Sequence, residues 1–385
     1  MKYYLIAGEA SGDLHGGNLI REIRKLDNAA DMRCWGGDKM EAAGAVLVKH
    51  YRDLAFMGFT EVLMNLRTIF RNLAFCKEDI LAYKPDTLIL IDYPGFNLRI
   101  AKWAKEQGLK VIFYISPQVW AWKEGRVRMM KQTIDKMIVI LPFEKEYYKN
   151  KWDWEVEYVG HPLVEVIDEA MAGPVPSFSD KPVIALLPGS RKQEILKKLP
   201  VMLQMSHVFP DHQFIVAKAP GVDGTFYDEL LKPYSNVSYV SNQTYPLLLQ
   251  ARAALVTSGT ATLETALFGV PEIVCYKGSP ISYQIAKRVI KVKYISLVNL
   301  IMDRLVVKEL IQDQLTVTNL KTELQSLLLD PAHQERLKKD YGELHNILSQ
   351  GGHASSKAAK SIVEFLQPDP PGRTLLPDQL DGKNN

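Results

Sequence analysis

The stretch MAGPVPSFSDKPVIALLPGSR, residues 171–191, decides how the chain is organised. Its first twelve residues hold three prolines together with glycine and serine, a composition typical of a linker. The compact apolar run Val183–Leu187 follows and ends at the turn residues Pro188 and Gly189. A short apolar run between turn signals is typical of a strand buried in a parallel sheet. We therefore predict that a second α/β unit begins directly after residues 171–182.

Similar apolar runs lie on both sides of this linker, with helical segments such as Asn18–Leu26 and Leu263–Phe268 between them. This alternation predicts an α/β chain with two doubly wound, Rossmann-like domains that face each other across a cleft. The further predicted strands are Tyr3–Ala7, Thr87–Ile91, Val111–Ile115, Lys136–Leu141, Glu157–Val159, Gln213–Ala217, Val237–Tyr239, Ala254–Thr257 and Glu272–Tyr276.

These patterns divide the chain into an N-terminal domain at residues 1–170 and a C-terminal domain at residues 183–353, joined by the linker 171–182. Residues 354–366 form an amphipathic helix, which we expect to pack back toward the N-terminal domain. Residues 367–385 are rich in proline and polar residues, which predicts a disordered tail.

Composition excludes several classes of protein. The chain of 385 residues carries a net charge of only +3, which does not favour a nucleic-acid partner. The three cysteines lie far apart and match no metal-binding spacing, which indicates reduced thiols in a cytoplasmic protein. No signal peptide is evident at the start, and no apolar run has the length of a membrane span.

Two candidate ligand-binding segments follow predicted strands of the first domain. GEASGD, residues 8–13, has small residues that let backbone N–H groups approach a ligand, although a tight structural turn fits equally well. It lacks the GxGxxG and GK[ST] patterns, so a dinucleotide fingerprint and a P-loop are disfavoured. Asp92, in IDYPGFN at residues 91–97, lies at a strand end, where it is placed to act as a general base or to cap the next helix.

Two further segments follow strands of the second domain. Arg191, at the end of LPGSR, is able to pair with a phosphate group near a helix start. SGTATLE, residues 258–264, gathers hydroxyls and N–H groups where a helix dipole favours a diphosphate. Glu264 lies among apolar neighbours, which favours a role in accepting hydrogen bonds from ribose hydroxyls over a surface position. The alternative for this segment is an ordinary Ser/Thr helix cap.

Two segments have the composition of a membrane-contacting surface. FMGFTEVLMNLRTIFRNLAF, residues 56–75, combines large apolar side chains with Arg67 and Arg71 on one helical face. Trp120 and Trp122 lead into a basic stretch. Apolar faces edged with arginine and lysine bind anionic membrane surfaces, whereas each segment alone also fits a core helix or a solvated turn. The expected contacts in these segments are Phe56, Met57, Phe59, Leu63, Leu66, Trp120 and Trp122.

A series of short sequence motifs between residues 8 and 300 resembles, in content and order, the motifs of the lipid-A-disaccharide synthase family. The motifs are GEASGD, FMGFTEVL, IDYPGFN, SPQVWAW, LPFE, VGHP, LLPGSR, SGTATLE and SLVNL. The resemblance implies a GT-B glycosyltransferase fold and a step of lipid A assembly. In that step UDP-2,3-diacylglucosamine and 2,3-diacylglucosamine 1-phosphate (lipid X) give a β-1′,6-linked disaccharide 1-phosphate and UDP, with inversion at the anomeric carbon.

Matching the motifs assigns roles to individual residues. Asp92 takes the role of general base, and Asp13, which also follows a strand end, is the second candidate. The residues expected to contact UDP or substrate are Gly8, Ser11, Gly12, Arg191, Ser258, Gly259, Thr260, Glu264 and Asn299. No metal and no cofactor is implied. The expected partners are the two acyl sugars and an anionic membrane surface, reached peripherally from the cytoplasmic side of the inner membrane, and a homodimer is compatible with this scheme.

The chain departs from the family pattern at Gly95, where many members carry an acid. This departure leaves Asp92 in place and puts in doubt any second carboxylate near the acceptor. Two other functions fit some of the same motifs. A UDP-sugar 2-epimerase shares the fold but needs no lipid surface, and a non-catalytic nucleotide-sugar-binding protein needs SGTATLE but not Asp92.

Overall fold

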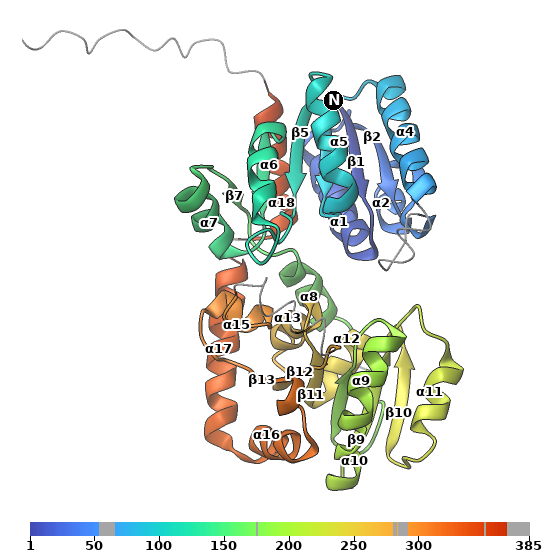
Figure 1. The fold of residues 1–385 in the computed structure, drawn as a ribbon, viewed down its shortest axis with the longest axis vertical. Coiled ribbons are helices and arrows are strands. Elements are labelled where there is room, and N and C mark those ends of the chain that lie inside the picture. Colours follow the sequence, from blue (N-terminus) through green and yellow to red (C-terminus); the bar gives the residue numbers. More distant parts are fainter. Residues whose placement is uncertain (54–65, 175, 280–282, 284–291, 350–351, 368–385) are drawn as a thin grey trace, which may run out of the picture. The chain divides into compact units, whose positions relative to one another are not determined.

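Two sheets of buried apolar strands organise the chain in a computed structural model (Figure 1). The residues of Tyr3–Ala7 and of Leu88–Ile91 are fully shielded from solvent. Runs of this length that are apolar throughout suit strands covered on both faces. The predicted α/β class with two doubly wound sheets is therefore confirmed. The structure describes residues 1–53, 66–174, 176–279, 283, 292–349 and 352–367.

The first sheet has the strand order β3-β2-β1-β4-β5-β6-β7. Its strands are β1 (Lys2–Ala7), β2 (Asp31–Gly36), β3 (Val46–His50), β4 (Thr87–Ile91), β5 (Lys110–Tyr114), β6 (Lys136–Val139) and β7 (Glu157–Tyr158). The helices in this part of the chain are α1 (Ala10–Leu26), α2 (Asp38–Ala42), α4 (Leu66–Tyr83), α5 (Pro94–Glu106), α6 (Val127–Thr133) and α7 (Pro142–Trp152). Strand β1 pairs in parallel with β2 and β4, so the strand order reverses between β1 and β4.

The second sheet repeats this arrangement with the order β10-β9-β8-β11-β12-β13. Its strands are β8 (Val183–Leu187), β9 (Gln213–Lys218), β10 (Val237–Ser241), β11 (Ala251–Thr257), β12 (Glu272–Tyr276) and β13 (Lys308–Ile311). The helices are α8 (Leu163–Met171), α9 (Lys192–Leu203), α10 (Met205–Val208), α11 (Gly224–Leu231), α12 (Thr244–Gln250), α13 (Thr260–Leu267), α15 (Leu297–Met302), α16 (Val317–Leu329) and α17 (Pro331–Ser349). Here the order reverses between β8 and β11, which both pair in parallel. Open α/β sheets bind ligands at such reversal points, beyond the carboxyl ends of the strands.

The compact units of the chain differ from the expected domain boundaries. One unit comprises Met1–Tyr114 with Ser355–Asn385, and the other comprises Ile115–Ala354. The first sheet nevertheless continues through β6 and β7, because these strands extend its hydrogen-bonded order. The terminal helix α18 (Ala354–Leu366) has the predicted bounds, and the ring of Phe365 lies under the ammonium of Lys110 in the first unit.

The boundary expected at residue 170 needs correction at helix α8. This helix belongs to the unit of the second sheet, where it packs against α12, α13 and α17. Asp168 of α8 lies 3.3 Å from the His345 ring of α17. The reason is the buried apolar face of α8, which includes Leu163, Val164 and Ile167 and is covered by these helices. Both α8 and the proline-rich stretch that follows it therefore belong to the second unit.

Several predictions concern residues outside the described part of the chain, namely the tail at 368–385 and the contacts Phe56, Met57, Phe59 and Leu63. The cysteines Cys34, Cys76 and Cys275 are buried and unpaired, as expected for reduced thiols. Among the described residues, no helix is both long enough and apolar enough to span a membrane.

Candidate functional site

The two predicted segments of the first unit leave the sheet side by side. Ala7 of β1 is paired with Ile91 of β4, so Gly8 and Asp92 are the next residues beyond the same edge. The ring of Tyr93 lies against Gly8, because a Cβ atom built at Gly8 would be 2.3 Å from the ring. Only glycine permits this close approach at residue 8.

The backbone at Asp92 is held in an unusual conformation. Asp92 and Tyr93 both have left-handed backbones, with φ of 45° and 49°. Such angles are costly for residues with a Cβ and persist where surrounding contacts enforce them. Here the Asp92 N–H donates to Tyr114 O at 3.1 Å, and the buried Asn97 donates from Nδ2 to Asp92 O at 2.8 Å. Pro94 at the start of α5 completes the turn.

The carboxyl group of Asp92 has the properties of a proton acceptor that works near neutral pH. Burial, reinforced by the negative charge of Glu9 at the start of α1, raises the pKa of Asp92 to about 6. A hydrogen bond with the backbone of Tyr93 opposes this shift. A general base is most effective when its pKa lies close to the working pH, so this geometry fits the predicted role.

Asp13 has a clear structural function in this sheet edge. Its side chain is buried, and it accepts hydrogen bonds from the N–H groups of Gly37 at 2.7 Å, Lys39 at 3.1 Å and Met40 at 3.0 Å. These donors lie at the start of α2, so Asp13 caps that helix from α1. Both carboxylate oxygens of Asp13 therefore already accept hydrogen bonds within the fold.

Two other predicted positions at this edge are exposed. Ser11 lies in the first turn of α1 at the surface, whereas Gly12 is buried beneath it. Gly95 is exposed, and a Cβ atom there would meet nothing within 4 Å. The site therefore has room for the acid that many family members carry at this position.

The predicted residues of the second unit line one pocket of about 460 Å³ at the reversal point between β8 and β11. Arg191, Ser258, Gly259, Thr260 and Glu264 all contribute to it, so the structure brings these five together. The remaining lining residues are Leu187, Gly189, Ser190, Glu194, Ala217, Lys218, Ala219, Pro220, Thr244, Thr257 and Ala261.

The start of α13 forms one wall of this pocket. Gly259 has φ of 148°, a conformation that side chains disfavour, and Thr260 begins the helix directly after it. Ser258 is held by donating from Oγ to Ile295 O at 2.8 Å. The N–H groups of Thr260 and Ala261 at the start of α13 have no acceptor within the helix, and the helix dipole adds positive charge there. This wall is therefore suited to a phosphate group.

Arg191 and Glu264 both line this pocket and carry opposite charges. Arg191 is exposed and lies 3.7 Å from Glu194 on the first turn of α9. Glu264 accepts a hydrogen bond from the Tyr245 hydroxyl at 3.1 Å. Burial raises the pKa of Glu264, although the Tyr245 hydrogen bond opposes the shift. A carboxylate held in this way remains able to accept a second hydrogen bond, such as one from a sugar hydroxyl.

Asn299, which was expected to contact the ligand, lies in the interior of the second unit. Its side chain is fully buried, and Oδ1 accepts from the N–H groups of Val306 at 2.8 Å and Val307 at 2.9 Å. Nδ2 donates to Val307 O and to Glu309 Oε1, each at 2.9 Å. All its hydrogen-bonding capacity is used inside the fold, so Asn299 supports the loop whose Ile295 oxygen holds Ser258.

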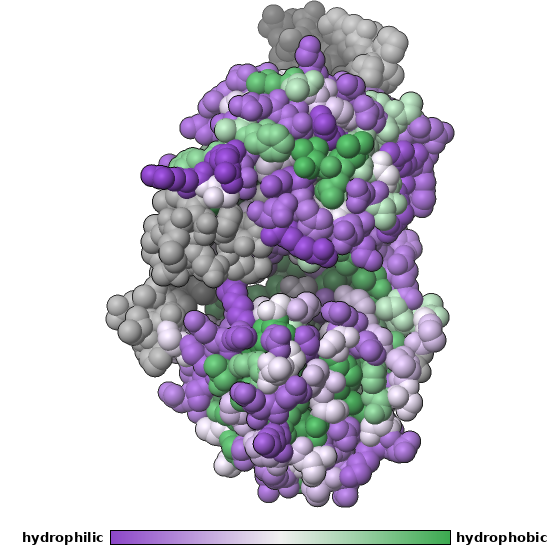
Figure 2. All heavy atoms as spheres, turned by 90° about the vertical axis from the view of Figure 1, so that its right-hand side faces the viewer, coloured by the Kyte–Doolittle hydropathy of each residue, from purple (hydrophilic) through white to green (hydrophobic). Residues whose placement is uncertain are grey.

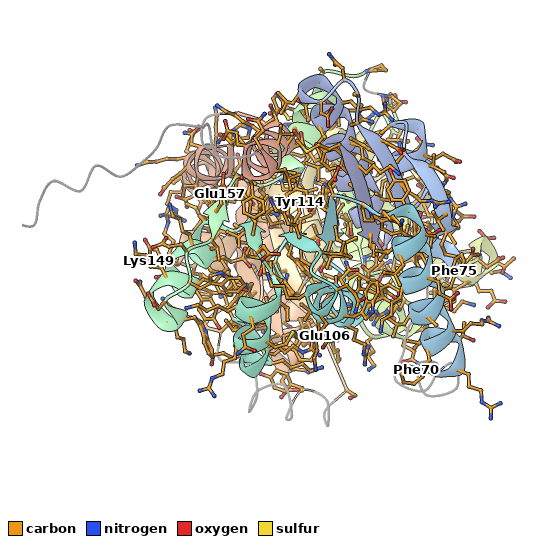
Figure 3. All side chains as sticks on the ribbon, turned by 90° about the horizontal axis from the view of Figure 1, so that it is seen from above. Phe70, Phe75, Glu106, Tyr114, Lys149 and Glu157 are labelled. Atoms are coloured by element: carbon orange, nitrogen blue, oxygen red, sulfur yellow. The ribbon has the colours of Figure 1, made fainter. Side chains whose placement is uncertain are left out.

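The apolar surface predicted for membrane contact is partly described. Trp122 is 49% exposed, with the Lys123 ammonium 4.0 Å from its ring centre. Trp120 is less available, since its indole N–H donates to Glu144 at 3.1 Å. On α4, Phe70 and Phe75 are 64% and 44% exposed (Figure 3). Figure 2 shows hydrophobic surface set among hydrophilic surface on the first unit. Leu66 begins α4.

Several residues that line the pocket were not predicted from the sequence. Lys218 and Thr257 end strands β9 and β11, and Thr244 begins α12. The rule that ligands bind beyond the carboxyl ends of parallel strands would have identified the first two. In the described parts of the chain, no group of three or more His, Cys, Asp or Glu side chains is arranged to hold a metal ion.

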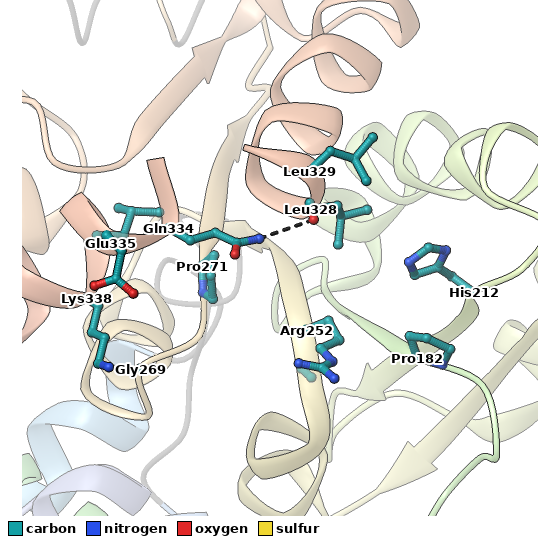
Figure 4. Close-up of a pocket in the computed structure, with 12 residues that line it drawn as sticks. Pro182, His212, Arg252, Gly269, Pro271, Leu328, Leu329, Gln334, Glu335 and Lys338 are labelled. Carbon is teal, nitrogen blue, oxygen red and sulfur yellow. Dashed lines mark hydrogen bonds between the residues drawn. The ribbon is translucent and has the colours of Figure 1, made fainter. Parts of the chain in front are cut away.

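Another hollow, of about 630 Å³, lies at the amino ends of the same strands (Figure 4). Pro182 and Pro271, which precede β8 and β12, line it together with Arg252 and Lys338. In this hollow Gln334 donates to Leu328 O at 3.2 Å. Its position, opposite the carboxyl edge of the sheet, separates it from the pocket that contains the predicted ligand residues.

Solved structures share this fold at low sequence identity. The UDP-GlcNAc 2-epimerase from Neisseria meningitidis, solved bound to UDP-GlcNAc, matches with a TM-score of 0.66 at 15% identity, covering 95% of this chain and 99% of that one. CalG4, the calicheamicin glycosyltransferase, matches with a TM-score of 0.59 at 18% identity, covering 95% and 98%. Together they confirm the predicted GT-B type of two Rossmann-like domains, and at these identities they show the fold alone.

Sequence relatives are far closer. The lipid-A-disaccharide synthase of Geobacter sulfurreducens is 38% identical over 376 residues, covering 94% of this chain and 96% of the relative. The enzyme of the same name from Syntrophus aciditrophicus is 38% identical over 380 residues, covering 95% and 98%. A family model described as Lipid-A-disaccharide synthetase matches residues 3–365. The matched residues include the motifs at both sheet edges, and the chain belongs to the lipid-A-disaccharide synthase family.

Proposed function

We propose that this protein is an inverting glycosyltransferase of lipid A biosynthesis that joins UDP-2,3-diacylglucosamine to lipid X. Membership of the lipid-A-disaccharide synthase family supports the reaction class. The observation that carries the mechanism is Asp92, a half-buried carboxyl group with a pKa of about 6 at the edge where a ligand is expected.

In the proposed reaction, the 6-hydroxyl of lipid X attacks the anomeric carbon of the donor while Asp92 takes its proton. The bond between that carbon and the diphosphate oxygen breaks, and its electron pair leaves with UDP. A single displacement of this kind inverts the α-linked donor to a β-1′,6 product. General base catalysis of such a step contributes about 100- to 10,000-fold in rate.

The pocket of the second unit is the proposed UDP site. Its support is the combination of Arg191, the start of α13 at Thr260, and Glu264 in one cavity of about 460 Å³. In this proposal Arg191 and the helix start bind the diphosphate, and Glu264 accepts hydrogen bonds from the ribose. The same positive groups stabilise the charge that develops on UDP as it leaves.

Release of UDP, measured with and without lipid X, tests this function against its alternatives. A synthase releases UDP from UDP-2,3-diacylglucosamine only when lipid X is present. A UDP-sugar 2-epimerase changes the sugar without an acceptor, and a binding protein produces neither change. Absence of acceptor-dependent UDP release would refute the proposed activity.

We also propose that the protein reaches its lipid substrates peripherally, from the cytoplasmic side of the inner membrane. The support is the exposed Trp122 beside Lys123, and Phe70 of α4 between the exposed Arg67 and Arg71. Basic residues near an anionic surface contribute about 1 kcal/mol each, so salt should release part of the bound protein. Sedimentation with anionic vesicles at low salt tests the proposal, and protein that stays in the supernatant would contradict it.

A further inference from the structure

A buried lysine lies directly behind the proposed UDP pocket. Lys198 of α9 is 4% exposed, and its ammonium donates a hydrogen bond to the Thr257 hydroxyl at the end of β11. A Cβ atom built at Gly189 would lie 3.4 Å from the same Nζ. Because Gly189 and Thr257 both line the pocket, the ammonium lies against the inner side of its wall.

The charges around Lys198 leave this wall positive. Glu194 is the facing carboxylate among the described residues, and it also lies 3.7 Å from Arg191. The Cys275 thiol is close as well, but burial raises its pKa to about 12, so it stays neutral. Lys198 and Arg191 therefore both lie near the Glu194 carboxylate beside the pocket.

Burial of an ammonium in this position has no evident benefit for folding. Removing the charge from water is costly, and a neutral hydroxyl offsets only part of that cost. An ammonium has three N–H donors, and among the described residues Thr257 is its one hydrogen-bond acceptor. A positive charge kept in this arrangement, against the wall of the proposed UDP pocket, indicates a function in that pocket.

We propose that Lys198 is a positioning residue for the diphosphate of the sugar donor. Its ammonium orients the Thr257 hydroxyl and supplies positive charge behind the wall formed by Gly189 and Thr257. The negative charge on the diphosphate increases as the glycosidic bond breaks, so this contribution grows toward the transition state. The inference rests on the proposed function, because it assigns Lys198 to the same UDP site.

The test compares Lys198→Met with Lys197→Met, a matched control on the same helix whose lysine is exposed. UDP and uridine are each titrated into wild type and both variants by calorimetry. Lys198→Met should weaken UDP binding about 10- to 100-fold, the range expected for a lost interaction with a charged group. Uridine affinity should change by less than about 2-fold, since it carries no phosphate. Lys197→Met should leave both affinities unchanged.

Thr257→Val is a second variant, which keeps the side-chain shape and the lysine but removes the hydroxyl. Thr257→Val should also weaken the binding of UDP more than that of uridine, which keeps the inference testable if Lys198→Met does not fold. Wild-type UDP affinity in Lys198→Met or in Thr257→Val would overturn the inference, as would an equal loss of UDP and uridine. Failure of the wild type itself to bind UDP is a different result, which would overturn the proposed function and the inference with it.

Discussion

The ring of Tyr93 lies so close to Gly8 that a Cβ atom at residue 8 would be 2.3 Å from its Cγ. Tyr93 directly follows Asp92, and both residues have left-handed backbones. The contact therefore connects the turn after β1 with the turn that holds the proposed base. A change at Gly8 reaches Asp92 through this ring.

Gly8→Ala should lower turnover while UDP affinity stays the same. The added methyl displaces Tyr93 and with it Asp92, and a misplacement of about 1 Å can reduce a rate about 100-fold. Steady-state kinetics and UDP titration provide the two measurements. Gly95→Ala is the matched control, because that glycine is exposed and its Cβ would meet nothing within 4 Å. Normal turnover in Gly8→Ala would show that the contact has no catalytic importance.

Glu9→Gln should move the acid limb of the pH–rate profile to lower pH. Asp92 acts as a carboxylate, so the rate should rise with pH through its pKa of about 6. The negative charge of Glu9 helps to raise that pKa, and its removal lowers it. Glu106→Gln, at an exposed position at the end of α5, serves as the control. An unchanged acid limb in Glu9→Gln would contradict the assignment of that limb to Asp92.

Arg191 and Glu264 in the pocket of the second unit should differ in which part of UDP they bind. Replacing Arg191 with Met removes a charge-assisted contact, which should weaken the binding free energy of UDP by about 1.5–3 kcal/mol. Glu264→Ala should weaken UDP more than inorganic phosphate, because its proposed partner is the ribose. Calorimetric titrations measure both, with Arg252→Met in the opposite hollow as control. Unchanged UDP affinity in both variants would show that this pocket is not the UDP site.

Glu272 should make the fold less stable as the pH rises. Its side chain is 1% exposed, neither carboxylate oxygen has a hydrogen-bond partner among the described residues, and burial raises its pKa well above the usual value. The folded state thus holds the proton more tightly than the unfolded state, so stability falls as the pH rises above the unfolded pKa of about 4.3.

Glu272→Gln removes this titration and keeps the shape of the side chain. At pH 8 the free energy of unfolding of the variant should exceed that of the wild type by about 1–3 kcal/mol, so the variant should unfold at a higher temperature. This difference should shrink toward pH 5. Thermal unfolding across this pH range measures the effect. Glu335→Gln, at an exposed position on α17, should change little. Equal pH dependence in wild type and Glu272→Gln would contradict a buried neutral acid.

Much of the fold was predictable because most strands are continuous apolar runs. Strands β4, β8 and β12 have the predicted bounds. Strand β2 reads DMRCWG and β13 reads KELI, so charged residues interrupt the apolar pattern and both strands were missed. In β13 the charged side chain of Glu309 has a structural role, because it accepts hydrogen bonds from the N–H groups of Ile295 and Ser296. Such long-range pairing leaves no periodic signal in the sequence.

Candidate site residues could be recognised where a polar side chain follows a strand end, as at Asp92, Arg191 and Ser258. The interior hydrogen bonds of Asn299 could not be predicted, because a sequence does not reveal whether an amide is already fully hydrogen-bonded. The burial of Lys198 could not be predicted, because a lysine on a helix is expected to lie on a solvated face, as its neighbour Lys197 does. Only the packing of α9 against the end of β11 separates the two lysines.

The most direct test of the account is the turnover of Asp92→Asn, measured beside its UDP affinity and with Asp13→Asn for comparison. Asparagine keeps the shape of Asp92 but does not accept the proton as a carboxylate does. The account predicts that turnover falls by about 100- to 10,000-fold or more while UDP affinity and folding stay near wild type. Near-normal turnover in Asp92→Asn, with a selective collapse in Asp13→Asn, would contradict it and transfer the role of base to Asp13.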